Sequence, residues 1–381
     1  MMDAGRGGRG SPRVAIAHDY LTQRGGAEKV VLSLSRAFPD APIYTLLYEP
    51  DRTYEEFRDK TIITSPVNRV GALRRDHRSA LPLLPSAASR LRVDADIVVV
   101  SSSGWAHGFD IPGYSLVYCY SPARWLYQTE VYLGESASAL KKLAIRVLGG
   151  RMRRWDRAAA LGCDRYLAIS SAVRDRIRDT YGLESTVVPA PVIPPVEPAT
   201  AQTPPAGVPQ RPFHLCISRL LAYKNVDAVI ESFRGTDDHL VVVGRGPEAD
   251  RLRAIAPDNV TMLCDLTDAE MGWLYENCTA VVAASFEDYG LTPLEGGMRG
   301  KPCAVLRWGG FLDTIDEGVN GVFFDRPDPA SIRAAVSELA TREWDAEQIK
   351  SHVGQFGEET FVKEMRNLVS AVAGVREAEC A

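Results

Sequence analysis

A proline-rich stretch divides the 381-residue chain into two halves and so limits the folds that it can adopt. Prolines are denser between Pro189 and Pro212 than anywhere else in the sequence. Because proline has no backbone N–H, this stretch can form neither a sheet ladder nor a helix interior. We therefore interpret residues 191–212 as an interdomain linker that is partly extended and partly disordered. Two domains also suit the length, which exceeds that of one ordinary hydrophobic core.

Both halves repeat one alternation of short apolar strands and helices. The first half begins with a β-branched strand at Arg13–His18, and apolar residues at helical spacing follow at 27–38. The second half begins again with a strand at Phe213–Ser218. Strands that alternate with helices form parallel sheets covered by helices. We therefore expect an α/β protein with two β/α domains, at residues 13–190 and 213–357.

Local signals predict where several helices begin. Ser171 is a suitable cap for a helix at 170–181. The T-x-x-E pattern at Thr267 and Glu270 is typical of a capping box. A further helix is expected around Asp313–Glu317. Each of these helices follows a strand, as the alternation requires.

The composition is that of a globular protein that does not bind nucleic acid. Apolar residues make up 45% of the chain and charged residues 24%, and the net charge is −5. Seven cysteines are scattered singly without a C-x-x-C pattern, which indicates reduced thiols in a cytoplasmic protein rather than disulfides or zinc. Residues 1–12 lack an apolar segment and are expected to be a disordered tail rather than a signal peptide. No apolar run approaches the roughly 18 residues that span a bilayer.

Two carboxylates follow an apolar strand in the second half. Glu287 comes directly after the strand, and Gly290 allows a tight turn. Pro293 is suited to the first turn of a helix, which then contains Glu295. Strand ends and helix starts at this edge of an open sheet bind ligands and anions. The pair therefore predicts a site for sugar hydroxyls and phosphate, with a glycosidase that uses both carboxylates as the alternative.

Two cations follow the first strand of the same half. Arg219 and Lys224 are five positions apart in one loop, so both can reach one diphosphate. Either alone could be a surface charge. Together with Glu287 and Glu295 they describe a site for a nucleotide sugar.

Two other patterns admit a simpler explanation. Gly25 and Gly26 lie between the first strand and the first helix, where the turn either cradles an anion or only connects the two elements. Asp94 and Asp96 form a D-x-D triplet of the kind that holds a divalent metal. The triplet precedes a strand rather than following it, so we expect no metal site.

An aromatic segment at 118–134 precedes a basic segment at 141–157. The aromatic residues either line an acceptor pocket or pack in the core, and the acceptor-side candidates are Tyr120, Arg124 and Trp125. The basic segment interleaves Lys and Arg with apolar residues, which is typical of a helix on the inner face of a membrane. The same pattern fits a solvated helix face beside a core stripe, and both interpretations stay open.

Three motifs together resemble a known family. They are S-R-L-x-x-x-K-N at 218–225, V-V-V-G-R-G-P-E at 241–248 and E-D-Y-G-L-T-P-L-E at 287–295. They resemble the signatures of retaining glycosyltransferases with the GT-B fold, the group-1 or GT4 family. Segments 18–29 and 309–321 resemble it too, so the likeness covers nearly the whole chain. Within the family the chain most resembles bacterial mannosyltransferases that use GDP-mannose, the WbaZ-like group.

The resemblance implies a role for each motif residue. Arg219 and Lys224 would bind the diphosphate of the sugar donor, Glu287 the sugar hydroxyls and Glu295 the ribose. Backbone groups would complete the binding site of the sugar donor at Gly25, Gly26, Gly244, Leu266, Gly290, Leu291 and Thr292. The family's last helix, here 358–381, would cross back to the first domain.

One position departs from the family pattern. Many members have a histidine that bonds the reacting sugar, in a C-H-T-P motif where this chain has Tyr120. His107 follows the preceding strand and either replaces that histidine or is a bystander.

The resemblance implies a retaining, metal-independent transfer that forms an α-linkage. Mannose from GDP-mannose would move to a hydroxyl of a glycan, lipid-linked or small-molecule acceptor, and no cofactor is needed because the nucleotide sugar is a substrate. The acceptor hydroxyl would attack from the leaving-group face, and the phosphate would take its proton. The alternatives are a UDP-sugar-dependent transferase, a nucleotide-sugar 2-epimerase and a non-catalytic nucleotide-sugar binder.

Overall fold

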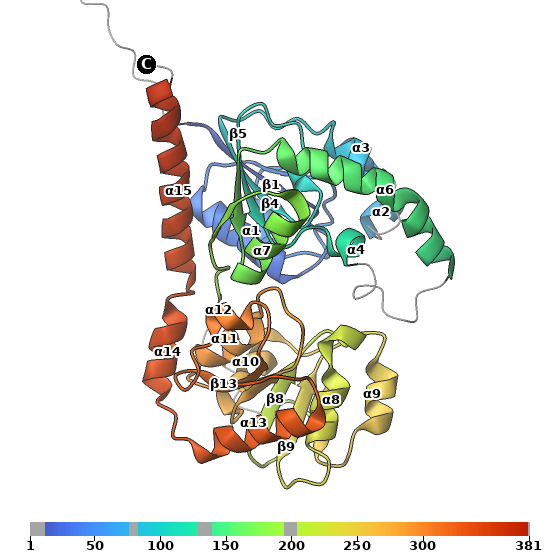
Figure 1. Cartoon of the computed structure of the whole chain (residues 1–381), viewed down its shortest axis with the longest axis vertical. Helices are drawn as coiled ribbons and strands as arrows, with labels where there is room; N and C mark the ends of the chain where they lie inside the picture. The colour runs from blue at the N-terminus through green and yellow to red at the C-terminus, as the bar shows by residue number, and fades with distance from the viewer. Residues whose placement is uncertain (1–11, 76–82, 129–138, 194–203, 380–381) are drawn as a thin grey trace, which may run out of the picture.

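The computed structural model describes residues 12–75, 83–128, 139–193 and 204–379, which form two α/β domains (Figure 1). The N-terminal sheet has the strand order β3-β2-β1-β4-β5-β6-β7, and the C-terminal sheet has the order β10-β9-β8-β11-β12-β13. Neighbouring strands are parallel throughout both sheets. The expected architecture of two parallel, Rossmann-like sheets is therefore confirmed.

The N-terminal domain begins with β1 and ends with β7. Its strands are β1 (Val14–His18), β2 (Ile43–Thr45), β3 (Ile62–Thr64), β4 (Ile97–Ser102), β5 (Tyr114–Cys119), β6 (Arg165–Ala168) and β7 (Ser185–Val187). Its α-helices are α1 (Gly26–Ala37), α2 (Gly71–Arg75), α3 (Leu84–Ala88), α4 (Arg124–Tyr127), α6 (Ala139–Leu161) and α7 (Ser171–Tyr181). Short 3₁₀ turns are η1 (Glu55–Asp59), η2 (Pro66–Arg69) and η3 (Ala106–Gly108). Every residue of the central strand β4 is buried, as in a parallel sheet covered on both faces.

The C-terminal domain repeats the plan. Its strands are β8 (Phe213–Ile217), β9 (His239–Val243), β10 (Val260–Leu263), β11 (Val281–Ala283), β12 (Cys303–Leu306) and β13 (Gly321–Phe324). Its helices are η4 (Ala222–Lys224), α8 (Val226–Ser232), α9 (Ala249–Ile255), α10 (Asp268–Asn277), α11 (Leu291–Gly297), α12 (Phe311–Thr314) and α13 (Pro329–Thr341), and α14 (Ala346–Gly354) and α15 (Glu358–Glu379) follow.

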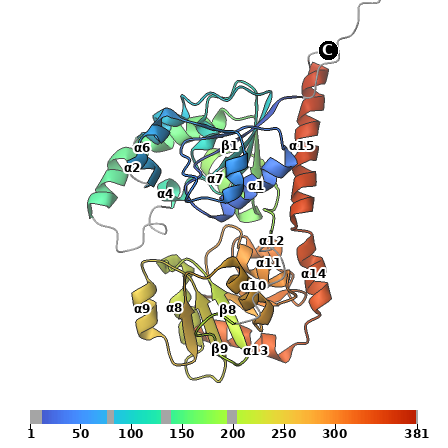
Figure 2. The same cartoon turned by 180° about the vertical axis from the view of Figure 1, so that it is seen from behind.

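Helix α15 returns to the N-terminal domain, as the resemblance implied. Figures 1 and 2 show it running alongside that domain next to α1. The Arg366 guanidinium donates to the Ala37 carbonyl at 2.9 Å, and the rings of Phe361 and Tyr118 lie 5.5 Å apart. The N-terminal hydrophobic core also includes Tyr289 of the C-terminal domain. The two domains are therefore packed against each other through apolar as well as polar contacts.

Two local predictions need correction. The cap of α7 is Ser170 and not Ser171, because Ser170 has extended backbone and its hydroxyl accepts from the Val173 N–H at 3.2 Å. Ser171 is the first helical residue, and its N–H instead donates to Asp313 at 2.7 Å. The helix expected around Asp313–Glu317 starts earlier and ends at Thr314, where Ile315 takes extended backbone. The capping box of Thr267 and Glu270 is present at α10.

Some predictions fall partly outside the described residues. The tail at 1–12 and the linker at 191–212 include residues 1–11 and 194–203, which the structure does not describe. The basic segment lies within α6, but the side chains of residues 139–148 are also outside the description. Its membrane contact stays a prediction. Among the described residues, no helix combines the length and apolar character that crossing a bilayer requires.

Candidate functional site

The centre of the site is an ion pair between two neighbouring strand ends. Strand β8 pairs with β11, so the loops that follow them lie side by side. The Lys224 ammonium contacts the Glu287 carboxylate directly, and Ser285 Oγ donates to the same oxygen at 3.1 Å. The Asn225 side chain donates to the Ala284 carbonyl at 2.7 Å and ties the two loops together. The structure therefore brings together two residues that the motifs assigned to one ligand.

Charge balance keeps Glu287 ionised. Burial alone would raise the pKa of Glu287, but the Lys224 ammonium and the Arg124 guanidinium together lower it below its ordinary value. Lys224 is itself buried, with only 6% of its side chain exposed. The site thus presents a fixed carboxylate with a cation beside it. Such a pair can accept hydrogen bonds from sugar hydroxyls while the cation faces an anionic group.

Arg219 lies at the exposed side of the same loop. Its guanidinium donates to the Tyr223 hydroxyl at 3.3 Å, and Lys224 Nζ lies 4.9 Å from the centre of the Tyr223 ring. The tyrosine therefore stands between the two cations that were assigned to the diphosphate. An exposed and a buried cation in one loop can contact different phosphates of one diphosphate.

Glu295 lies in α11 and has partners from both domains. The Tyr275 hydroxyl donates to it at 2.5 Å, and Lys29 Nζ of the N-terminal domain lies 3.7 Å away. Burial raises the pKa of Tyr275 well above its ordinary value, so its phenol remains a hydrogen-bond donor. Neither Tyr275 nor Lys29 was singled out in the sequence.

Four predicted backbone positions lie at or beside the start of α11. Gly290 has φ of 88°, in the left-handed region, and an added Cβ would lie 2.2 Å from Phe311. A Cβ at Gly26 would lie 3.2 Å from the side chain of Leu291, so the glycine turn of the N-terminal domain faces α11 across the interface. Thr292 is half-buried beside Leu291. These contacts place the Gly25–Gly26 turn next to α11, and its role as an anion-cradling turn stays a prediction.

Gly244 and Leu266 lie at the ends of β9 and β10. A Cβ on Gly244 would lie 1.9 Å from the Ser218 carbonyl, so the glycine permits close packing of two strand ends. Leu266 is half-buried against the core. Packing therefore accounts for Gly244, and the binding role of both residues stays a prediction.

The acceptor-side candidates differ in what they contact. The Tyr120 hydroxyl lies 2.8 Å from Ser101 Oγ, to which His18 also bonds at 2.9 Å, and donates to the Ala27 carbonyl at 3.2 Å. Arg124 reaches the C-terminal domain, where it donates to the Phe286 carbonyl at 3.2 Å. Trp125 lies in α4, and its side chain is outside the description. Of these candidates, Arg124 is thus shown to approach the ion-pair centre.

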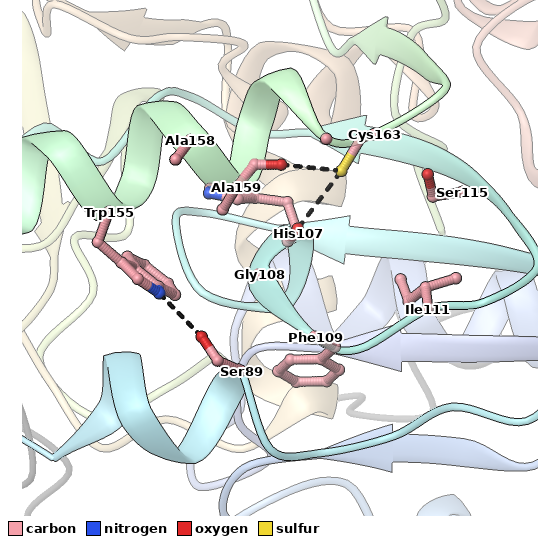
Figure 3. Close-up of a pocket in the computed structure, with 11 residues that line it drawn as sticks. Ser89, His107, Gly108, Phe109, Ile111, Ser115, Trp155, Ala158, Ala159 and Cys163 are labelled. Carbon is pink, nitrogen blue, oxygen red and sulfur yellow. Dashed lines mark hydrogen bonds between the residues drawn. The ribbon is translucent and has the colours of Figure 1, made fainter.

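His107 lies inside the N-terminal domain, in the turn η3 that follows β4. Figure 3 shows it beneath α6, where it lines a cavity of about 310 Å³ with Trp155 and Cys163. It is buried, and its Nε2 lies 3.2 Å from Asp156. All residues that line this cavity belong to the N-terminal domain. The contacts favour the bystander interpretation over a replacement of the family histidine.

The D-x-D triplet contacts an arginine. The backbone N–H of Arg13 donates to Asp96 at 2.8 Å, and its guanidinium lies 3.5 Å from Asp94. Within the described residues there is no cluster of three or more side chains suited to a metal.

A buried carboxyl that the sequence did not reveal lies next to the glycine turn. Glu28 is in the first turn of α1, 1% exposed, and its Oε2 has no hydrogen-bond partner in the described structure. An added Cβ on Gly25 would lie 2.6 Å from this oxygen. Burial raises the pKa of Glu28 to about 7, against hydrogen bonds from Gln23 and the Gly25 backbone that favour the charged form.

This raised pKa makes a stability prediction. Because the folded-state pKa lies above the unfolded value of 4.5, ionisation of Glu28 weakens the fold as pH rises towards 7, by roughly 3 kcal/mol in full. The free energy of unfolding of Glu28→Gln, relative to that of the natural protein, should therefore be larger at pH 8 than at pH 5. Denaturant unfolding at both pH values measures this gain, with the exposed Glu347→Gln as control. An equal difference at both values would contradict the prediction.

Two family models match the sequence, one on each side of the proline-rich stretch. Glycosyltransferase Family 4 matches residues 24–194, and Glycosyl transferases group 1 matches residues 202–354. Both halves of the chain therefore match glycosyltransferase families, the C-terminal half the group 1 family. The group 1 match contains the loops of Lys224, Glu287 and Glu295, and the Family 4 match contains the glycine turn that faces them.

Individual relatives match only part of their own length. The GDP-mannose-dependent alpha-mannosyltransferase of Corynebacterium glutamicum is 32% identical over 123 residues, which are 32% of this chain and 30% of that protein. The chain matches less than half of the length of each of the first five curated relatives. Identity to the relatives is thus local.

Solved structures match over the whole chain. Sucrose-phosphate synthase from Thermosynechococcus elongatus superposes with a TM-score of 0.72 at 16% identity, over 95% of this chain and all of that one. Anabaena HepE in complex with UDP-glucose gives 0.65 at 15% identity, over 94% of this chain and 99% of that one. These likenesses show the GT-B fold.

Proposed function

We propose that the protein is a retaining, metal-independent glycosyltransferase that moves mannose from GDP-mannose to a hydroxyl acceptor and forms an α-linkage. The family and the fold support glycosyl transfer from a nucleotide sugar. The local identity to a GDP-mannose-dependent alpha-mannosyltransferase supports the choice of sugar donor. The acceptor is a hydroxyl of a glycan, a lipid-linked glycan or a small molecule.

The ion pair of Lys224 and Glu287 carries this proposal. A buried cation next to a carboxylate at two adjacent strand ends suits a ligand with phosphates at one end and hydroxyls at the other. Lys224 and Arg219 stabilise the departing nucleoside diphosphate, and Glu287 holds sugar hydroxyls. Glu295, fixed by Tyr275, holds the ribose. The paired-carboxylate glycosidase is disfavoured, because each glutamate already has a cation or phenol partner within the site.

The proposed chemistry is the same-face displacement that the family resemblance implies. The bond between the sugar C1 and the phosphate oxygen breaks, and its electron pair stays with the diphosphate. The acceptor oxygen forms the new bond to C1 on the same face, and its proton passes to a phosphate oxygen. The protein contributes preorganised charge around the leaving group rather than a nucleophile.

A panel of nucleotide sugars tests the sugar donor. We expect GDP-mannose to raise the melting temperature of the protein and to be slowly hydrolysed, whereas UDP-glucose and ADP-glucose do neither. UDP-sugars are the main competitor, because the similar Anabaena HepE was solved with UDP-glucose. Stabilisation by UDP-sugars alone would replace GDP-mannose in the proposal. Binding without turnover of any sugar donor, with acceptors supplied, would favour a non-catalytic binder.

A further inference from the structure

Asp288, the residue directly after Glu287, is held by two arginines of the other domain. Arg124 Nε lies 3.0 Å from one carboxylate oxygen, and Arg176 Nη1 donates to the other at 2.6 Å. All three side chains are largely buried, with 14% of Asp288 exposed. Charge-assisted hydrogen bonds to both oxygens fix the carboxylate in position as well as in charge.

Arg124 contacts the loop of Glu287 and also the loop that carries Arg219 and Lys224. Its guanidinium donates to the Phe286 carbonyl, and it lies 5.6 Å from the centre of the Tyr223 ring. Tyr223 in turn stands between Arg219 and Lys224. One side chain of the N-terminal domain therefore contacts both loops that carry the proposed residues for the sugar donor.

Arg176 anchors the contact on the N-terminal side. The nitrogen that donates to Asp288 also donates to Ser121 Oγ at 2.8 Å. Ser121 directly follows Tyr120, in the strand-end motif where the family histidine is replaced. The three charges thus join the strand-end loop of one domain to the loop of Glu287 in the other.

These contacts exist only while the domains are together. Arg124 and Arg176 come from α4 and α7, and Asp288 comes from the loop between β11 and α11. If the domains separate, Phe286 loses its hydrogen bond from Arg124, and Asp288 loses its bonds to both arginines. These two residues flank Glu287 in sequence. A shift of about 1 Å in a binding group can cost roughly a hundredfold in rate.

We propose that Arg124, Arg176 and Asp288 form an interdomain latch of positioning residues, which aligns Glu287 with the sugar when the domains close. The latch deepens the proposed function and rests on it for the role of Glu287. It acts through Glu287 and Tyr223, and none of its members needs to touch the reacting atoms. The latch joins the two domains of the same chain, and the ligand that Glu287 would hold in place is the nucleotide sugar.

Three variants test the latch by kinetics. Asp288→Asn keeps the shape and removes the charge, and Arg176→Met keeps the apolar stem. Each is expected to lower kcat by roughly 10- to 100-fold, while the dissociation constant for the free nucleoside diphosphate changes less than about twofold. The double variant should lose no more than the stronger single one, because both remove one interaction. Arg178→Met is the matched control, because Arg178 lies on the same helix and pairs with Asp175 outside the site.

Small-angle X-ray scattering gives a readout that needs no turnover. The radius of gyration should increase in Asp288→Asn and Arg176→Met relative to the natural protein and to Arg178→Met. If the natural protein turns over no sugar donor, the proposed function fails, and scattering alone then decides whether the latch exists. Variants that keep both kcat and compactness would overturn the latch. So would a loss of nucleotide affinity equal to the loss of kcat, because that would indicate general damage to the site.

Discussion

Lys224→Ala is expected to lower kcat/KM for the nucleotide sugar by about a thousandfold. Lys224 is the buried cation of the site, and removing one preorganised charge from a developing anion typically costs a hundred- to a thousandfold. Its loss also leaves Glu287 without its closest partner. Steady-state kinetics with the preferred sugar donor measures the effect, and Lys350→Ala, an exposed lysine paired with Glu347, is the control. Turnover that is unchanged in Lys224→Ala would refute the proposed role of the ion pair.

The same variant has a stability effect that depends on pH. The lowered pKa of Glu287 contributes stability above its unfolded pKa, and this contribution is lost as pH falls through the folded value. Lys224 is the main source of that lowering. The difference in free energy of unfolding between the natural protein and Lys224→Ala should therefore be larger at pH 7 than at pH 3. A difference that is constant between these values would show that Lys224 stabilises the fold by packing alone.

The sequence predicted the parts of the site that depend on strand ends. Glu287 and Lys224 each follow a strand of the C-terminal sheet, and parallel strands end at one edge. No further information was needed to expect them near each other. Glu295 was predictable in the same way, because Pro293 indicates the start of the helix that carries it.

Contacts between the domains were not predictable. Arg176 is separated from Asp288 by 112 residues, and nothing in either local pattern shows how the two sheets are oriented. Lys29 and Glu295 depend on the same orientation. The glycine turn gave a partial signal, since an anion-cradling turn must face a ligand, but it could not indicate Leu291 as the opposing residue.

Local geometry, which the sequence pattern does not show, decided the outcome at His107 and at the cap of α7. His107 follows a strand, as a ligand-binding residue would, yet η3 turns it under α6 against Trp155. A strand-end position gives the direction of the chain but not of the side chain. Ser170 and Ser171 are equally suited to a cap, and only the backbone angle of Ser170 separates them.

Gly290→Ala is expected to be among the most destabilising single changes in the C-terminal domain. The backbone at Gly290 has φ of 88°, which costs an L-residue about 1–2 kcal/mol. The new Cβ would also lie 2.2 Å from Phe311, a buried ring, and overpacking adds roughly 1–3 kcal/mol. Activity should fall as well, since Gly290 joins the loop of Glu287 to the helix of Glu295.

Gly235→Ala separates the two causes. Gly235 has a similar φ of 72°, but nothing lies within 4 Å of an added Cβ. Denaturant unfolding should therefore show a loss of about 1–2 kcal/mol for Gly235→Ala and roughly twice that for Gly290→Ala. Phe311→Leu in the Gly290→Ala background should recover part of the difference, because a smaller side chain makes room for the methyl group. Equal losses in the two alanine variants would mean that backbone conformation alone fixes this turn, and that Phe311 does not hold the loop of Glu287 against α11.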